Sequence, residues 1–214
     1  MERGKIIYAY DALCGWCYGF SPVISDIHEK YRSELEFEVV SGGMITGKRI
    51  GPIGEVAPYI RWAYKDVEKA TGVRFGAGFL EGVLAEGKAI FNSIPPAVAL
   101  SVFKTYQPDR AVAFAGTLQK AVYYDGLEPE QVPAYGPYAE AYGIPEAEFT
   151  AKMQEESYQK LAQRDFEQSA ALEVNGFPSV FLVQGDTAWL VARGYTPFPM
   201  LDERIQKLLH PQTT

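Results

Sequence analysis

The hydrophobic positions near the N-terminus predict two strands with a helix between them. The apolar run from Ile6 to Tyr10 is typical of a buried strand, and residues 35–40 alternate before they end in two valines. Residues 15–32 between them have helical period and contain Pro22, which removes one backbone hydrogen bond and kinks a helix. This pattern predicts a β-α-β unit with parallel strands.

After the second predicted strand, the apolar residues recur with the period of a helix. From residue 51 to about residue 172 the strand signals fade, and Gly, Pro and Asn separate the apolar segments. The last of these helices should begin with Glu146 and Glu148 in its first turn, where acidic side chains favour a helix N-terminus. The expected helices span residues 58–71, 81–91, 97–106, 110–125, 132–142 and 146–173. We therefore predict an all-helical insertion over residues 51–172.

Strand periods return near the C-terminus. Residues 179–183 and 187–192 flank a Gln-Gly-Asp turn signal and predict a β-hairpin. An amphipathic helix is expected after Pro197. The predicted fold class is α/β, with the order β-α-β, helical insertion, β-β-α. Residues 1–50 and 173–214 would form one domain that the insertion interrupts.

Composition excludes several partner classes. The 214 residues are 47% hydrophobic, which is enough to bury a sizeable core. A net charge of −7 gives no basic surface, so nucleic acid is not an expected partner. No apolar run approaches the roughly 20 residues that span a bilayer, and no secretory leader pattern is visible. We expect no membrane partner and a cytoplasmic location.

The two cysteines carry the clearest chemical signal. Cys14 and Cys17 are the only cysteines, and they directly follow the first predicted strand. If Cys14 ends the turn and Cys17 lies one turn into the helix, the two sulfurs fall within disulfide geometry. Unpaired N–H groups and the helix dipole would then stabilise a Cys14 thiolate. We expect Cys14 to be the nucleophile and Cys17 the resolving thiol that attacks the mixed disulfide.

Three other interpretations of the cysteine pair have less support in the sequence. A zinc site needs about four ligands, and the chain offers only His28 and His210 besides the cysteines. Free cysteines are often inert core residues, but the turn-like setting argues against that use. A static disulfide over so short a loop would constrain the unfolded chain little. In a reducing cytosol such a pair is more often catalytic, and we expect no metal or organic cofactor.

The order of elements and two motifs resemble a known family. The Cys-Gly-Trp-Cys motif at residues 14–17 and the Gly-Phe-Pro at residues 176–178 are similar to those of the DsbA family of thiol-disulfide oxidoreductases, in the branch near FrnE-like and protein disulfide isomerase-like proteins. The resemblance covers almost the whole chain. It implies a thioredoxin-like fold with a helical insertion, and protein or small-molecule disulfides and thiols as substrates.

The resemblance also implies roles for individual residues. The bond before Pro178 would be cis and would face the cysteine pair. The backbone of Phe177 would then offer an edge to an extended substrate, beside Cys14. Gly15, Trp16, Phe177 and Pro178 are the expected substrate-binding residues, and packing over the turn is the alternative for Trp16.

The chain departs from the family pattern near the cysteines. Many relatives bury an acid six positions before the first cysteine, and here that position holds Tyr8. Asp11 is expected as an exposed turn residue or an N-cap. No histidine stands between the cysteines, so a strongly oxidising pair is not assured. For residues 92–96 we expect a helix start capped by Ser93, and a loop over the thiol site is the alternative. Five tyrosines should pack between helices with their hydroxyls satisfied: Tyr123, Tyr124, Tyr135, Tyr138 and Tyr142.

Two further functions stay open at this point. One is a glutathione-dependent transferase or isomerase of the kappa class, with glutathione as co-substrate and Cys17 dispensable. The other is a redox-inactive adaptor that uses the insertion as its partner surface. An intact second cysteine counts against both, because neither needs it chemically.

Overall fold

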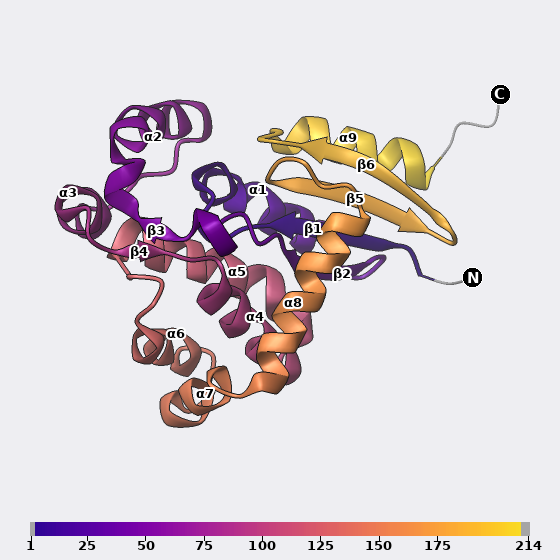
Figure 1. Cartoon of the computed structure of the whole chain (residues 1–214). Helices are drawn as coiled ribbons and strands as arrows, with labels where there is room; N and C mark the ends of the chain where they lie inside the picture. The colour runs from indigo at the N-terminus through magenta and orange to yellow at the C-terminus, as the bar shows by residue number, and fades with distance from the viewer. Residues whose placement is uncertain (1–2, 211–214) are drawn as a thin grey trace.

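Two sheets of different size are present in the computed structural model, which describes residues 3–210 (Figure 1). The strands are β1 (Lys5–Tyr10), β2 (Glu36–Ser41), β3 (Gly51–Pro52), β4 (Ile90–Phe91), β5 (Ser179–Gln184) and β6 (Thr187–Arg193). The main sheet has the order β2-β1-β5-β6, and β3 pairs with β4 separately. β1 is parallel to β2 and antiparallel to β5, which confirms the predicted β-α-β unit and the C-terminal hairpin.

The helices surround this sheet and fill the segment between β2 and β5. They are α1 (Gly15–Tyr31), α2 (Ala57–Thr71), α3 (Leu84–Glu86), α4 (Ile94–Tyr106), α5 (Ala111–Lys120), α6 (Gly136–Glu140), α7 (Glu146–Met153), α8 (Glu156–Ala171) and α9 (Phe198–Leu209). Figure 1 shows α2, α3, α6 and α7 on the side of the molecule away from β6 and α9, with α4 and α5 between. Within residues 3–210, no helix has the length and apolar character needed to cross a bilayer.

The segment between β2 and β5 is helical apart from the short strands β3 and β4. The predicted helix over residues 81–91 is wrong in its second half, where Gly87 ends α3 with a φ of 69°. The backbone N–H groups of Ile53 and Gly54 donate to the carbonyls of Ala89 and Gly87, both at 2.9 Å. The apolar residues near 90 therefore pair as a strand. The division of the chain into domains stays a prediction.

The long helix expected over residues 146–173 is also wrong, because α7 and α8 are separate. Glu155 has extended backbone between them, with φ −76° and ψ 134°. Both helices pack against α4, and α7 also contacts α6 whereas α8 also contacts β2. The buried side chains are Phe149 and Met153 in α7, and Ala162, Asp165 and Ser169 in α8.

A buried ion pair fastens α4 and α8 to the end of β2. The Lys104 ammonium donates to the two carboxylate oxygens of Asp165, at 2.9 and 2.8 Å, and to the carbonyl of Val39 at 3.1 Å. The same carboxylate accepts the backbone N–H of Ser41 at 3.2 Å. Burial raises the pKa of Asp165, although the nearby ammonium lowers it. The pair thus fixes where the chain leaves β2, just before the residues that reach the cysteine turn.

Replacing Lys104 with methionine tests this attachment. Lys104→Met leaves the Asp165 carboxylate buried without its cation, so we expect the free energy of unfolding to fall by about 3 kcal/mol. Urea denaturation followed by circular dichroism measures the change. Lys160→Met is the matched control, because Lys160 pairs with Glu156 on the surface, where both side chains are more than 60% exposed. We expect the control to cost about 0.5 kcal/mol or less, and equal losses in the two variants would contradict the account.

Candidate functional site

The cysteine turn lies at the carboxyl end of β1 and starts α1. Cys14 is the N-cap residue, with extended backbone, and its Sγ accepts the backbone N–H of Cys17 at 3.4 Å. The N–H of Cys14 donates to the carbonyl of Asp11 at 3.1 Å and closes the turn. Cys14 is 7% exposed and Cys17 is 0% exposed. Of the two thiols, only that of Cys14 has any contact with solvent.

Cys17 is held as a neutral thiol. Burial raises its pKa well above the ordinary value, and the hydrogen bond and charge of Cys14 raise it further. Tyr8 lies in the same core and is 1% exposed, so an aromatic ring occupies the position where many relatives bury an acid. Burial also raises the pKa of Tyr8. The interior beneath the turn therefore strongly disfavours negative charge.

The loop before β5 meets the turn at Cys14. The Phe177-Pro178 peptide bond is cis, and the Phe177 carbonyl lies 3.6 Å from the Cys14 Sγ. The Phe177 ring packs against Gly42, where an added Cβ would come within 2.0 Å of it. The Pro178 carbonyl accepts the N–H of Gly194 at 2.7 Å. The structure thus brings residues 177 and 178 to the cysteine turn, as the resemblance implied.

Gly15 and Trp16, between the cysteines, lie at the rim of the site. Gly15 is partly buried, and a Cβ added there would lie 3.6 Å from the Phe75 ring. The Trp16 ring is also partly buried, with its centroid 6.4 Å from that of Tyr195. Trp16 therefore packs over the turn and at the same time faces the surface beside Cys14.

Asp11 does not have the environment that was predicted for it. It is neither exposed nor an N-cap: it is 2% exposed, and the N-cap is Cys14. Its carboxylate accepts the backbone N–H of Leu13 at 2.9 Å, that of Met44 at 2.7 Å, and the Ser93 hydroxyl at 2.9 Å. Burial raises the pKa of Asp11, and these hydrogen bonds oppose the shift.

Ser93 joins the cysteine turn to the start of α4. Ser93 is the N-cap residue of α4, as predicted, but its side chain makes no capping hydrogen bond. Instead its Oγ donates to Asp11 and accepts the backbone N–H of Ile45 at 2.9 Å. The Asn92 side chain instead accepts a hydrogen bond from the first residue of α4, the backbone N–H of Ile94, at 2.9 Å. Ser93 therefore connects the start of α4 to the cysteine turn, whereas Asn92 bonds to Glu130 and residues 92–94 do not line the pocket beside Cys14.

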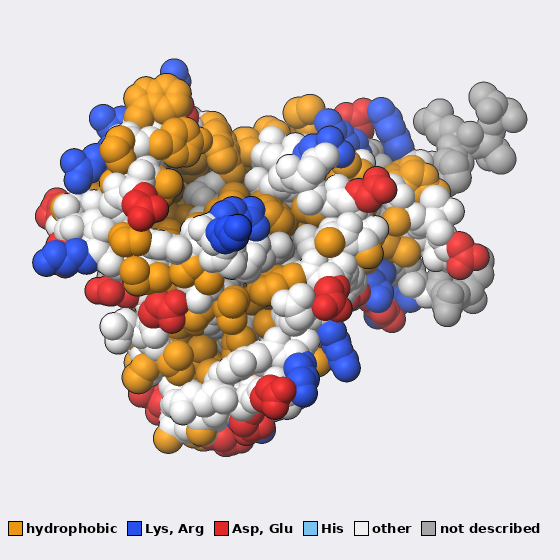
Figure 2. All heavy atoms as spheres, in the orientation of Figure 1, with side chains coloured by type: hydrophobic (Ala, Val, Ile, Leu, Met, Phe, Trp, Pro, Cys, Tyr) orange, Lys and Arg blue, Asp and Glu red, His pale blue; other side chains and the backbone are white. Residues whose placement is uncertain are grey.

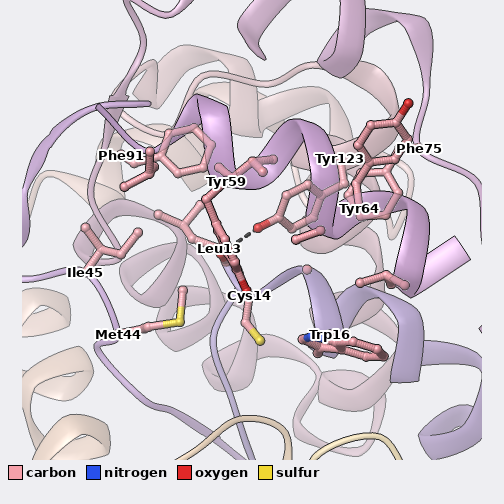
Figure 3. A pocket seen from close by; sticks show the side chains of 15 residues that line it. Leu13, Cys14, Trp16, Met44, Ile45, Tyr59, Tyr64, Phe75, Phe91 and Tyr123 are labelled. Carbon is pink, nitrogen blue, oxygen red and sulfur yellow. Dashed lines mark hydrogen bonds between the residues drawn. The ribbon is translucent and has the colours of Figure 1, made fainter. Parts of the chain in front are cut away.

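A pocket of about 320 Å³ opens beside Cys14. Figure 3 shows the Cys14 sulfur between the side chains of Met44 and Trp16, below a group of aromatic rings. Tyr123 is one of these rings, and its hydroxyl donates to the carbonyl of Leu13 (Figure 3). The prediction of packed tyrosines with satisfied hydroxyls is confirmed for Tyr123 and for Tyr135, whose hydroxyl donates to the Pro129 carbonyl, and is wrong for Tyr124, which is 47% exposed. The place of Tyr123 in a pocket wall has no sequence signal, because the wall forms only when distant segments meet.

Residues 3–210 contain no group of three or more His, Cys, Asp or Glu side chains positioned to hold a metal ion. His28 packs edge-on against Phe37, with 4.7 Å between the ring centroids, and burial lowers the pKa of its imidazole.

Replacing Ser93 with alanine tests whether its hydrogen bonds stabilise the site. Ser93→Ala leaves the N–H of Ile45 without an acceptor and removes one donor from Asp11, so we expect a loss of about 1–3 kcal/mol in the free energy of unfolding. Ser101→Ala is the control on the same helix. Ser101 is equally buried, but its hydroxyl donates to the Ala97 carbonyl, so no donor is orphaned and about 1 kcal/mol or less should be lost. The explanation fails if urea denaturation shows a larger loss in the free energy of unfolding for Ser101→Ala than for Ser93→Ala.

Several solved structures share the fold of this chain. A proposed protein disulfide isomerase from Nitrosomonas europaea is 26% identical, with a TM-score of 0.87 over 99% of this chain and 100% of its own. The cytosolic disulfide reductase DsbM from Pseudomonas aeruginosa is 23% identical, with a TM-score of 0.80 over 96% of this chain and 98% of its own. A 2-hydroxychromene-2-carboxylate isomerase is 15% identical, with a TM-score of 0.67 over 96% of each chain.

The sequence comparisons identify the family. No curated protein sequence matches the chain. The model of the DSBA-like thioredoxin domain matches residues 5–206, which is nearly the whole chain. The chain therefore belongs to the family of DSBA-like thioredoxin domains and is a thiol-disulfide oxidoreductase.

Proposed function

We propose that the protein exchanges disulfides through the Cys14–Cys17 dithiol, with Cys14 as the attacking thiol. The observation that supports this most directly is the asymmetry of the pair. Cys14, at the N-terminus of α1, is 7% exposed and lines an open pocket, whereas Cys17 is completely buried one turn further on. The N–H of Cys17 and the positive end of the helix dipole favour negative charge on the Cys14 sulfur.

The reaction transfers two electrons in two steps. The Cys14 thiolate attacks one sulfur of a substrate disulfide, a mixed disulfide forms, and the first substrate thiolate leaves and takes a proton from water. Cys17 then loses its proton and attacks the Cys14 Sγ. The second substrate thiol leaves, and the protein holds a Cys14–Cys17 disulfide. The reverse sequence oxidises a substrate dithiol and restores the two protein thiols.

The charge of Cys14 sets the order of these steps. A Cys14 thiolate raises the pKa of Cys17, in addition to the larger effect of burial. Once Cys14 is part of a mixed disulfide its negative charge is gone, so Cys17 becomes easier to deprotonate. The resolving thiol is therefore activated by the first step. Phe177 would align the substrate backbone through its peptide groups, since its carbonyl already lies beside the reacting sulfur.

A dithiol mechanism is favoured over glutathione transfer. In a transferase the thiol of glutathione would react, and the protein would have no use for a buried resolving cysteine. The likeness to the chromene-carboxylate isomerase, at 15% identity, extends to the fold only. A cytosolic location is part of the proposal, because DsbM is cytosolic and a reducing compartment keeps such a dithiol ready to act.

Trapping the mixed disulfide tests the roles of the two cysteines. Cys17→Ala should form a stable mixed disulfide when mixed with an excess of a disulfide peptide, because no thiol is left to resolve it. Intact-protein mass spectrometry measures the adduct. Wild type should instead yield an internal disulfide and free peptide thiol, and Cys17→Ala should lose catalytic turnover of disulfides.

Cys14→Ala is the matched control for this experiment. Its remaining thiol is buried, so we expect no adduct on the native protein and full modification in urea. Modification of native Cys14→Ala as fast as of Cys17→Ala would contradict the assignment. Two results together would favour the transferase instead. The first is that Cys17→Ala transfers glutathione to an electrophile as fast as wild type does, and the second is that wild type shows no dithiol turnover.

The buried thiol also predicts how stability depends on pH. The folded state keeps Cys17 protonated, whereas the unfolded chain ionises it near pH ~8.5. Its stabilising contribution is therefore complete below that pH and declines as the pH rises, by up to about 1.4 kcal/mol per pH unit. Urea denaturation of the reduced protein at neutral and alkaline pH measures this decline. Cys17→Ala lacks the titrating group, so a decline of the same size in that variant would refute the explanation.

A further inference from the structure

Two neutral polar side chains are buried beneath the cysteine turn without hydrogen bonds. Tyr8 of β1 is 1% exposed, and Gln119 of α5 is 0% exposed. Within residues 3–210, neither the Tyr8 hydroxyl nor the two polar atoms of the Gln119 amide have a hydrogen-bond partner. Charged side chains, in contrast, are spread over the face of the molecule that Figure 2 shows. Because an unpaired polar group in a core lowers stability, packing alone does not account for this pair.

The Gln119 amide lies next to the Tyr8 hydroxyl. α5 packs against α1 and β2, and Gln119 is one of the residues that α5 buries. Burial raises the pKa of Tyr8 well above its ordinary value, so the hydroxyl keeps its proton, and the Gln119 amide opposes the shift. A side-chain amide has this effect when its N–H group is directed at the phenol oxygen. The proton of the Tyr8 hydroxyl is then free for a different acceptor.

The packing of the Tyr8 ring points to Cys17 as that acceptor. Tyr8 and Cys17 belong to the same buried core, and the Tyr8 ring centroid lies 5.9 Å from that of Phe20. Phe20 is one turn beyond Cys17, on the same buried side of α1. Apart from burial, the charge of a Cys17 thiolate raises the pKa of Tyr8 more than the other described charges do. The Tyr8 hydroxyl is therefore close enough to Cys17 to respond to its ionisation.

Asp11 is the carboxylate that acts on Cys17, but it is poorly placed to take the proton of that thiol. Burial and Cys14 raise the pKa of Cys17 most, and the charge of Asp11 raises it further, although the Asp11 backbone lowers it. The Asp11 carboxylate also already accepts three hydrogen bonds. A Cys17 thiolate needs a hydrogen-bond donor, and Tyr8 is a buried donor that has no acceptor in the described part of the chain.

We propose that the Tyr8 hydroxyl, oriented by Gln119, donates a hydrogen bond to the Cys17 sulfur as that thiol ionises in the second step of the reaction. The inference rests on the proposed function, because it takes Cys17 as the resolving thiol. In this step the Cys14–Cys17 bond forms and the bond between Cys14 and the substrate sulfur breaks. The proton of Cys17 ends on the departing substrate thiolate. Tyr8 stays protonated throughout and stabilises the negative charge that develops on Cys17.

Two-phase reduction of an aromatic disulfide tests the inference. Reduced, full-length protein is mixed in a stopped-flow instrument with an excess of dithiobis(nitrobenzoate), which releases a coloured thiolate at each step. Attack by Cys14 gives a first phase whose rate rises with reagent concentration, and attack by Cys17 gives a second phase whose rate does not. We expect Tyr8→Phe to slow the second phase at least about tenfold at neutral pH, because one hydrogen bond to a charged group is lost. The first phase should stay within about twofold of wild type.

Tyr10→Phe is the matched control. Tyr10 is also 1% exposed, and its hydroxyl also lacks a partner among residues 3–210. Burial raises its pKa most, and the charges of Asp11 and Asp165 then act on it more strongly than that of Cys17. The Tyr10 hydroxyl therefore belongs to a different part of the core. Both phases of Tyr10→Phe should match those of wild type.

Gln119→Leu tests the positioning role of the amide. It removes the group that orients Tyr8, so the second phase should slow by about threefold or more while the first phase is unchanged. This variant keeps the test decisive if Tyr8→Phe does not fold. Circular dichroism on heating checks the folding of each variant. Tyr8→Phe should unfold at or above the wild-type temperature, because it loses no hydrogen bond that the reduced protein makes.

The pH dependence of the second phase separates this role from a structural one. Its rate in wild type should rise with pH until Cys17 is ionised, and in Tyr8→Phe the rise should occur at higher pH, because the thiolate has lost its donor. Cys14 is uncharged in the mixed disulfide, and burial keeps the neighbouring tyrosines protonated, so Asp11 is the other titrating group near Cys17 and is the same in both proteins. A hydroxyl that only fills space would leave this pH profile unchanged.

The outcomes separate the two proposals. If the second phase of Tyr8→Phe or of Gln119→Leu keeps its wild-type rate, the inference is overturned and the dithiol function stands. Equal slowing in Tyr8→Phe and Tyr10→Phe also overturns it, because a general disturbance of the core would then explain both results. If wild type shows no second phase at all, the proposed function itself fails.

Discussion

The buried carboxylate of Asp11 is the point on which the arrangement of the site depends. It accepts donors from the cysteine turn, from the loop after β2 and from the start of α4, through Leu13, Met44 and Ser93. A buried carboxylate is stable only when donors satisfy it, so each of these segments is held in the one place where its donor reaches Asp11. The thiol turn and the helical segment between β2 and β5 are positioned by the same group.

Two properties of the site follow from this arrangement. The turn places Cys14 against an open pocket and Cys17 in a core that disfavours charge, so the two thiols differ in their access to a substrate. The loop after β2, held by Asp11, also supplies Met44 to the pocket wall. The reacting sulfur and the pocket are thus neighbours, and Asp11 bonds to both the cysteine turn and the loop that supplies Met44.

The sequence predicted those parts of the fold whose signals are local. Strand period, the hairpin turn and the Cys-Gly-Trp-Cys motif gave β1, α1, the hairpin and the cysteine turn, and all are confirmed by the structure. The prediction that Asp11 is exposed or an N-cap is wrong because two of its partners lie 33 and 82 residues away, at Met44 and Ser93. The separation of α7 from α8 and the pocket role of Tyr123 likewise depend on packing between distant segments, for which a single sequence carries no pattern.

The reduction potential of the Cys14–Cys17 pair tests the central claim most directly. The protein would be equilibrated in buffers of graded glutathione ratio, and its free thiols counted after acid quenching. Because burial and Cys14 raise the pKa of Cys17 and no histidine stands between the cysteines, the account predicts one internal disulfide whose potential is nearer to the roughly −270 mV of thioredoxin than to the roughly −120 mV of DsbA. If both thiols stay free at every ratio, or only glutathione adducts form, the dithiol account is contradicted.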